Sequence, residues 1–267
     1  MVEVHGHGPR RYVLQPGLVQ GYGPSSYGEG MAEVYDDWYA DVSDVEATVA
    51  LLRSLHAAGP SGPVLELAVG TGRLAVPLAA AGLEVHGVDA SPAMLTRLAQ
   101  RPGGDAVHAT LGDMADEEPR GPFALAFVAY NSLFNLTAAE EQARCIANVA
   151  RRLLPGGCFV VDAFVPEPTF GGPGEHVALR SLQSDAVVLS VSRHDGGHQR
   201  AEGAYVELRD GQPVRVRPWA IRWSTLAELD TWAEQAGLRR EHRWADILRR
   251  PFDESSAHHV SVYRRPA

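Results

Sequence analysis

The chain has 267 residues, 45% of them apolar, and a net charge of −9. This length suits one large domain with an elaboration, and the acidic balance argues against general attraction to nucleic acid or to an anionic membrane. All 24 basic residues are arginine, which excludes Schiff-base chemistry and the lysine of a P-loop. A small or neutral ligand is the expected partner.

Residues 1–26 are rich in glycine, histidine, proline and tyrosine without periodicity, which predicts a loose N-terminal arm. His5 and His7 in this arm have the spacing of a metal pair but no third ligand nearby, so we predict no metal. The arm lacks a signal-peptide pattern, and no apolar run approaches about 18 residues. We therefore expect a cytoplasmic protein, with Cys145 and Cys158 as reduced core residues.

Two stretches, 27–42 and 44–59, carry apolar residues at helical spacing and predict two N-terminal helices within residues 27–60. From Pro63 onward, strand patterns alternate with helix patterns, which predicts a parallel sheet covered on both faces. The predicted strands of this core, residues 61–165, are 64–67, 84–88, 106–110, 124–130 and 158–164.

Between residues 166 and 222 the pattern changes to short strands separated by turn sequences such as HDGG and RDGQP. The strands 185–192, 203–209 and 214–222 predict an antiparallel β insert. We expect this insert to act as a cap over a ligand pocket or as a dimer surface.

Residues 223–267 return to the core pattern. Thr225 and Glu228 form a capping box at the start of a helix. Two final strands, 238–244 and 258–265, are joined by about a dozen residues, too few for a parallel crossover. These two strands are therefore predicted to be antiparallel.

The turn after the first strand lies in VLELAVGTGRLAVPLAAAG, residues 64–82. A dinucleotide fingerprint needs glycine where Arg73 stands, and a P-loop needs GK[ST], which is absent. What remains is Glu66 on the strand, a turn in which Gly70 and Gly72 allow close backbone approach, and Arg73 in the first helical turn. A helix N-terminus with a guanidinium suits a carboxylate ligand.

Two more acidic residues end the next strands. Asp89 ends the second strand, where a carboxylate can accept both hydroxyls of a ribose. Asp113 follows the third strand and can accept from an exocyclic amine, with Met114 packing on the ring. Each acid alone is more often a cap or a solvated turn, but together they mark the sheet edge where open α/β sheets bind ligands.

The segments ELAVGTGR, VDASPAML and LGDM resemble the cofactor motifs of class I S-adenosylmethionine-dependent methyltransferases of the small-molecule type, and the resemblance spans nearly the whole chain. It implies a Rossmann-like, doubly wound sheet of seven strands, with the antiparallel last strand between the fifth and sixth positions. It also implies S-adenosylmethionine as cofactor and S-adenosylhomocysteine as product, with Arg73 facing the methionyl carboxylate, Asp89 the ribose and Asp113 the adenine. Ala68 departs from the family, which has glycine there.

The tyrosines of the first lid helix resemble those that close over the cofactor in small-molecule members. Tyr35 and Tyr39 lie four residues apart on one helical face, and simple packing of this helix on the domain is the alternative. The full set of expected cofactor residues is Tyr27, Tyr35, Tyr39, Glu66, Ala68, Gly70, Gly72, Arg73, Asp89, Ala90, Met94, Gly112, Asp113, Met114 and Tyr130.

Catalytic candidates on the acceptor side are Asn131, Asp162 and His258, which the topology brings to the same sheet edge. We expect methyl transfer to nitrogen, oxygen or carbon of a small molecule, such as a secondary metabolite, by a monomer or homodimer. Two alternatives stay open: an NAD(P)-dependent oxidoreductase on a similar sheet, and a non-catalytic S-adenosylmethionine-binding regulator.

Overall fold

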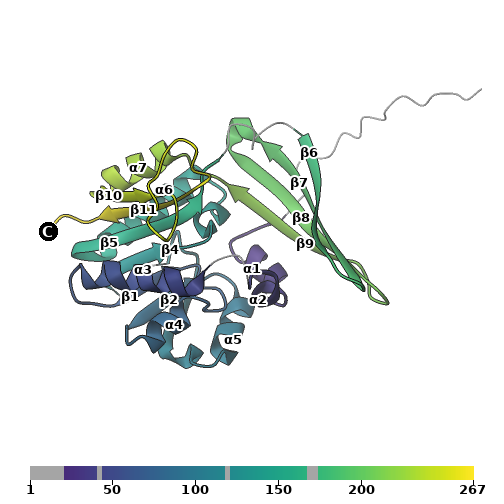
Figure 1. Cartoon of the computed structure of the whole chain (residues 1–267), viewed down its shortest axis with the longest axis horizontal. Coiled ribbons are helices and arrows are strands. Elements are labelled where there is room, and N and C mark those ends of the chain that lie inside the picture. The colour runs from purple at the N-terminus through teal and green to yellow at the C-terminus, as the bar shows by residue number, and fades with distance from the viewer. Residues whose placement is uncertain (1–20, 41–43, 118–120, 167–173) are drawn as a thin grey trace, which may run out of the picture.

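The computed structural model describes residues 21–40, 44–117, 121–166 and 174–267 of the chain. Its core is a seven-stranded sheet with the strand order β10-β11-β5-β4-β1-β2-β3 (Figure 1). The strands are β1 (Val64–Leu67), β2 (Val85–Asp89), β3 (Val107–Leu111), β4 (Phe123–Val128), β5 (Leu153–Phe164), β10 (Arg239–Trp244) and β11 (His258–Arg264).

Strand direction follows the predicted pattern. β1 to β5 are parallel, whereas β11 runs antiparallel to both of its neighbours, β5 and β10. The doubly wound sheet and the place of the last strand between the fifth and sixth are therefore confirmed. β1 and β4 are buried along their whole length, as expected for central strands covered on both faces.

Helices cover both faces of this sheet. α3 (Val45–Ala57), α4 (Ala75–Ala80) and α5 (Pro92–Gln100) pack on one face, and α6 (Ala139–Arg152) and α7 (Leu226–Gln235) pack on the other. The predicted capping box is present at the start of α7, where the Glu228 amide donates to the Thr225 hydroxyl at 3.2 Å and the Thr225 amide donates to Oε2 of Glu228 at 2.8 Å. Short 3₁₀ turns complete the elements: η1 (Gly104–Ala106), η2 (Ser132–Asn135) and η3 (Gly196–His198).

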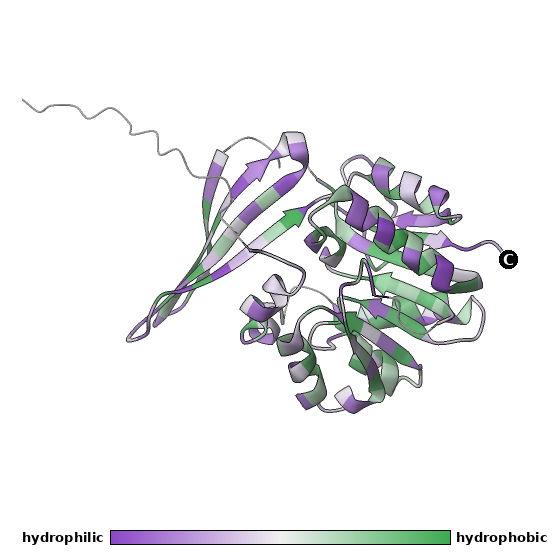
Figure 2. Ribbon diagram, turned by 180° about the vertical axis from the view of Figure 1, so that it is seen from behind, coloured by the Kyte–Doolittle hydropathy of each residue, from purple (hydrophilic) through white to green (hydrophobic). Residues whose placement is uncertain are grey.

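A second sheet of four antiparallel strands lies between β5 and α7 in the chain, in the order β6-β7-β8-β9. Its strands are β6 (Gly174–Leu182), β7 (Ala186–Asp195), β8 (Arg200–Arg209) and β9 (Arg215–Arg222). Sequence patterns predicted the last three strands and missed β6, because a register shift between Leu179 and Ser181 interrupts its alternation. Figure 2 shows hydrophilic and hydrophobic residues interspersed along this sheet, in contrast to the largely hydrophobic central strands of the core.

Two short helices, α1 (Ser26–Met31) and α2 (Tyr35–Trp38), lie between the core and the four-stranded sheet (Figure 1). On the core side, Oε1 of Glu29 accepts hydrogen bonds from the Ser91 hydroxyl at 2.7 Å and the Ala93 amide at 3.0 Å, at the start of α5. On the other side, Arg217 of β9 donates to the Gly30 carbonyl at 2.6 Å. These contacts tie α1 to both sheets.

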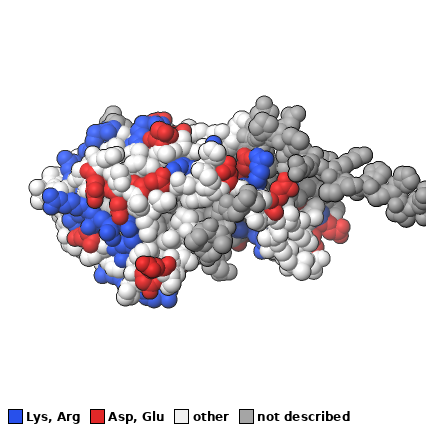
Figure 3. All heavy atoms as spheres, turned by 90° about the horizontal axis from the view of Figure 1, so that it is seen from above, with Lys and Arg blue, Asp and Glu red and all other residues white. Residues whose placement is uncertain are grey.

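Acidic and basic side chains lie side by side over the core on the face seen in Figure 3. Within the described ranges, no helix is long and apolar enough to cross a membrane. Cys145 and Cys158 are free thiols buried in the core, and burial raises their pKa values to about 12 and about 11. The predicted arm falls mostly outside the described residues, since residues 1–20 are not among them.

Candidate functional site

A cavity lies where the carboxyl ends of β1, β2 and β3 meet the short helices α1 and α2. Strand ends supply its floor, and α1, α2 and the turn η2 supply its walls. The lining residues are Pro24, Tyr27, Gly28, Tyr35, Ala68, Gly70, Val88, Asp89, Ala90, Met94, Asp113, Met114, Ser132, Asn135 and Leu136. The structure thus gathers nine of the predicted cofactor residues around one space.

A second cavity adjoins the first, since both are lined by Tyr35, Ala68 and Ser132. Its remaining lining residues are Glu66, Val69, Thr71, Arg73, Leu74, Ala129 and Tyr130. Three more predicted residues, Glu66, Arg73 and Tyr130, therefore lie beside the same space.

The turn after β1 is fixed on the end of β2. The Gly70 amide donates to Oδ2 of Asp89 at 2.8 Å, and the Ser91 amide donates to Oδ1 at 2.9 Å. Burial raises the pKa of Asp89, although these two hydrogen bonds oppose the shift. Each carboxylate oxygen keeps a further lone pair for a ligand.

Positive φ angles shape this turn. Ala68 has φ 54°, Gly70 55° and Gly72 78°. A Cβ on Gly72 would lie 2.2 Å from Cδ1 of Leu98, so this glycine is also needed for close packing against α5. Alanine tolerates the left-handed region at a cost of about 1 kcal/mol, so Ala68 carries strain that glycine would not.

Two buried atoms beside the second cavity have no hydrogen-bond partner among the described residues: Oε2 of Glu66 and Nη2 of Arg73. Burial raises the pKa of Glu66 well above its usual range, against the opposing charge of Arg73. The guanidinium of Arg73 lies 4.1 Å from the centre of the Tyr130 ring and donates through Nη1 to the Tyr39 carbonyl at 2.8 Å. One hydrogen-bond acceptor atom, on Glu66, and one donor atom, on Arg73, therefore lie beside the cavity without a partner among the described residues.

Asp113 lines the first cavity after β3, and Gly112 precedes it in the same turn. Oδ1 of Asp113 accepts from the Ala115 amide at 2.9 Å, and the Gly112 amide donates to the Asp89 carbonyl at 3.0 Å. A Cβ on Gly112 would lie 2.6 Å from the Glu117 side chain. Met114 is buried beside them.

The tyrosines between residues 27 and 39 contact one another. The rings of Tyr35 and Tyr39 have centroids 4.8 Å apart, and the hydroxyls of Tyr27 and Tyr39 lie 2.9 Å apart. Burial raises the pKa of Tyr35 to about 12 and raises that of Tyr27 well above its usual range, so both hydroxyls stay protonated at neutral pH. Tyr39 does not line either cavity and reaches them through Tyr27 and Arg73.

The chain is similar in sequence and in fold to known methyltransferases. Residues 64–157 match the family described as "Methyltransferase domain". The chain is 30% identical over 217 residues to the cypemycin N-terminal methyltransferase of a Streptomyces species, covering 80% of this chain and 87% of that protein. It is 36% identical over 190 residues to the demethylmenaquinone methyltransferase of Renibacterium salmoninarum, covering 70% and 68%. The solved CcbJ methyltransferase of Streptomyces caelestis is 38% identical, with a TM-score of 0.83, covering 92% of this chain and all of that one.

The chain belongs to the S-adenosylmethionine-dependent methyltransferases. It is an enzyme that transfers a methyl group to a small molecule, which confirms the predicted function over the NAD(P)-dependent and non-catalytic alternatives. S-Adenosylmethionine is its cofactor. The residues present fit that group, because the unpaired Oε2 of Glu66 and Nη2 of Arg73 suit the ammonium and carboxylate of an amino acid.

The three catalytic candidates of this methyltransferase lie together at the ends of β4, β5 and β11. Nε2 of His258 lies 2.9 Å from Oδ1 of Asp162, whose Oδ2 accepts from the Tyr130 amide at 3.1 Å. Oδ1 of Asn131 accepts from the Phe164 amide at 2.7 Å. None of the three candidates lines the two cavities, whereas Tyr130 does.

His258 and its neighbour His259 have different surroundings. Burial lowers the pKa of His258, but the hydrogen bond and charge of Asp162 outweigh it, so the net shift is upward. Burial and the charge of Arg243 lower the pKa of His259 to about 3, and its Nδ1 lies 2.9 Å from the Ser261 hydroxyl. Only the first of these two histidines contacts the candidate cluster.

Ten lining residues are not in the expected cofactor set: Pro24, Gly28, Val69, Thr71, Leu74, Val88, Ala129, Ser132, Asn135 and Leu136. Asn135 lies three residues after Ser132, and a 3₁₀ turn places residues i and i+3 on one side. A turn of four residues is too short to give a periodic pattern in the sequence. Pro24 lies at the end of the predicted arm, residues 1–26, where no pattern indicated a contact with the core.

Proposed function

We propose that the enzyme methylates an amine nitrogen of its small-molecule acceptor. The observation that carries this proposal is the pair formed by His258 and Asp162, whose Nε2 and Oδ1 lie 2.9 Å apart. Oδ2 of Asp162 accepts from the amide of Tyr130, which lines the second cavity, so the pair adjoins that space. An amine acceptor arrives as an ammonium and needs a base such as this histidine to remove its proton, which a carboxylate acceptor does not.

Aromatic walls support the same choice. Tyr27, Tyr35 and Tyr130 line the cavities, and ring faces attract cations. The name of the cypemycin N-terminal methyltransferase, 30% identical to this chain, also points to a nitrogen acceptor for that relative.

For the cofactor, we assign each end of the bound molecule to residues of this chain. Arg73 would hold the methionyl carboxylate and Glu66 the ammonium, while Asp89 would accept from the ribose hydroxyls. Asp113 would accept from the adenine amine, with Ala90, Met94 and Met114 packing on the ring. Gly70, Gly72, Gly112 and Ala68 shape the backbone that approaches it.

An ammonium must lose a proton before its nitrogen can attack. We assign that proton to His258, which Asp162 orients, with Asn131 fixing the adjoining loop on β5. Bound S-adenosylmethionine supplies an electrophilic methyl group on a sulfonium. The chain contributes orientation and exclusion of water, which supply most of the gain in such a transfer.

The domain organisation follows the same proposal. α1 and α2 would form the lid, and the insert of residues 166–222 would cap the acceptor side. α3 packs its leucines into the core and would belong with the core, residues 61–165 and 223–267. The cytoplasmic location, the monomer or homodimer state and the absence of a nucleic-acid partner stay predictions.

The test is an acceptor screen with S-adenosylmethionine labelled on its methyl group. The panel compares amino sugars and peptide N-termini with matched hydroxyl compounds, carboxylates and hydroquinones. We expect label on amine nitrogen, with products identified by mass spectrometry and NMR. Label on oxygen alone or on carbon alone would overturn the amine assignment.

A further inference from the structure

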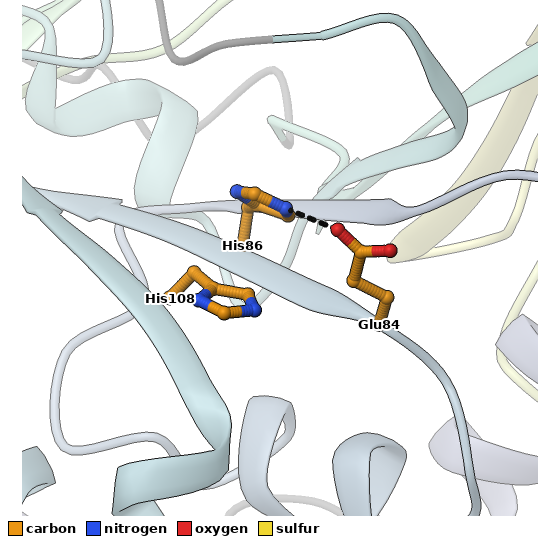
Figure 4. A group of neighbouring side chains, drawn as sticks. All are labelled: Glu84, His86 and His108. Atoms are coloured by element: carbon orange, nitrogen blue, oxygen red, sulfur yellow. Dashed lines mark hydrogen bonds and ion pairs between the residues drawn. The ribbon is translucent and has the colours of Figure 1, made fainter.

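Three side chains with metal-binding atoms meet at the end of β2 away from the cofactor cavity. They are Glu84, His86 and His108, and one ligand atom from each lies within 4.8 Å of the others. Figure 4 shows the two imidazoles facing each other across neighbouring strands, with the carboxylate of Glu84 reaching the ring of His86. Nε2 of His86 lies 3.0 Å from Oε1 of Glu84.

Strand pairing produces this cluster. His86 of β2 and His108 of β3 are direct partners in the parallel register, so their side chains share one face of the sheet. The hydrogen bonds between β1 and β2 continue to Glu84, just before β2, because its carbonyl accepts from the Val64 amide at 2.8 Å. Glu84 and His86 are two residues apart in extended backbone and therefore point to the same side.

The same face is open here because the described residues between β3 and β4 form no helix over it. Glu84 and His108 are exposed, and the side chain of His86 is 20% exposed. The ring of His86 meets the fully buried ring of Phe123 edge-on, with centroids 5.4 Å apart. Phe123 thus fixes the plane of one imidazole while solvent can reach the cluster.

We propose that Glu84, His86 and His108 bind a divalent first-row transition metal ion such as Zn²⁺. Two imidazoles and one carboxylate are a ligand set that zinc, copper and nickel accept, and three protein ligands leave one position for water. A tetrahedral zinc ion places its ligand atoms about 3.3 Å apart. The side chains need to close by about 1.5 Å, which rotation of the exposed His108 and Glu84 allows.

The site differs from the methyl-transfer site in position and role. Glu84 and Asp89 bound β2 at opposite ends, about 16 Å apart along the strand. A metal ion there links β2 to β3, the edge strand of the sheet. It stabilises the sheet that carries Asp89 and Asp113 and takes no part in the chemistry.

The test is calorimetric titration of the metal-free full-length protein with Zn²⁺ alone, for wild type, His108→Gln and Glu84→Gln. Both side chains are exposed, so both variants should fold, which circular dichroism checks. We expect one site in the wild type and affinity at least about tenfold weaker in each variant. Zinc should also raise the melting temperature of the wild type and not that of His108→Gln.

Two controls separate this cluster from other histidines. The double variant His5→Gln/His7→Gln removes the pair in the N-terminal arm. His176→Gln removes one ring of a second pair of neighbouring imidazoles, whose centroids are 4.5 Å apart. Both control variants should keep wild-type zinc affinity. Absence of zinc binding, unchanged affinity in His108→Gln and Glu84→Gln, or loss of affinity in either control would overturn the proposal.

Discussion

The backbone amide of Gly70 donates a hydrogen bond of 2.8 Å to Oδ2 of Asp89, which locks the turn after β1 onto the carboxylate at the end of β2. One carboxylate therefore has two tasks, since it orders the turn and also faces the cavity. A substitution at this position affects the shape of the site as well as its direct contact with the cofactor.

Replacing Asp89 with alanine should weaken binding of S-adenosylhomocysteine by about 1 to 3 kcal/mol, the usual cost of losing a charged hydrogen-bond partner. Calorimetry measures this directly. Asp210→Asn, in the exposed turn between β8 and β9, is the matched control and should bind as the wild type does. An unchanged dissociation constant in Asp89→Ala would remove this residue from the cofactor site.

Glu66→Gln should separate stability from cofactor affinity. Burial raises the pKa of Glu66, so the folded protein favours the protonated carboxyl. This contribution to the free energy of unfolding is complete below the ordinary pKa of a glutamate and is lost as pH rises through the raised pKa of Glu66. The ligand-free variant should therefore be more stable than the wild type at pH 8, with the difference vanishing near pH 4. Denaturant unfolding at both pH values measures this.

The same variant should bind S-adenosylhomocysteine more weakly, by about 1 to 3 kcal/mol, because a neutral amide replaces the partner of an ammonium. Equal affinity in Glu66→Gln and wild type would contradict the proposed role of Oε2. A lower free energy of unfolding for ligand-free Glu66→Gln than for the wild type at pH 8 would contradict the argument from the raised pKa instead.

His258 and Asp162 should control the pH dependence of turnover. Asp162 raises the pKa of His258, and a base must be unprotonated to accept a proton, so the rate should rise with pH through that raised value. His258→Gln should lower kcat by about 100-fold or more and flatten this limb. Asp162→Asn should move the inflection to lower pH, and an unmoved inflection would show that another group titrates.

The contact between lid and insert should matter for the acceptor. The rings of Tyr205 and Trp38 meet edge-on at 5.7 Å, and Arg180 lies 4.7 Å from the centre of the Tyr205 ring. Tyr205→Ala should raise KM for the acceptor and speed amide exchange in residues 27–40. Leu208→Ala, on the opposite face of β8, is the control and should change neither.

If exchange in residues 27–40 is the same with and without S-adenosylhomocysteine in the wild type, α1 and α2 pack statically and are no lid. If turnover in Tyr205→Ala matches the control while the lid loosens, the insert does not serve the acceptor.

Many residues that line the two cavities could be predicted because they follow strands with a clear sequence pattern. Asp89 and Asp113 follow strands, and parallel strands bring their carboxyl ends to one edge whatever the remaining contacts. Arg73 stood out because it replaces the small residue that a dinucleotide site needs. These inferences depend on chain order and strand direction alone.

What the sequence did not reveal depends on contacts between distant segments. The strand β6 was missed because the register shift near Arg180 breaks its alternation. The pairing of His86 with His108 needs the register of two strands separated by a helix. The unpaired atoms of Glu66 and Arg73 appear only once the surrounding core is packed.

The most direct test of the account is a crystal structure with S-adenosylhomocysteine bound. It should place the adenine beside Asp113 and Met114, the ribose hydroxyls on Asp89, the carboxylate on Arg73 and the ammonium on Glu66. A ligand bound in the reverse direction, or one whose amino-acid end leaves both Oε2 of Glu66 and Nη2 of Arg73 unpaired, would contradict the account.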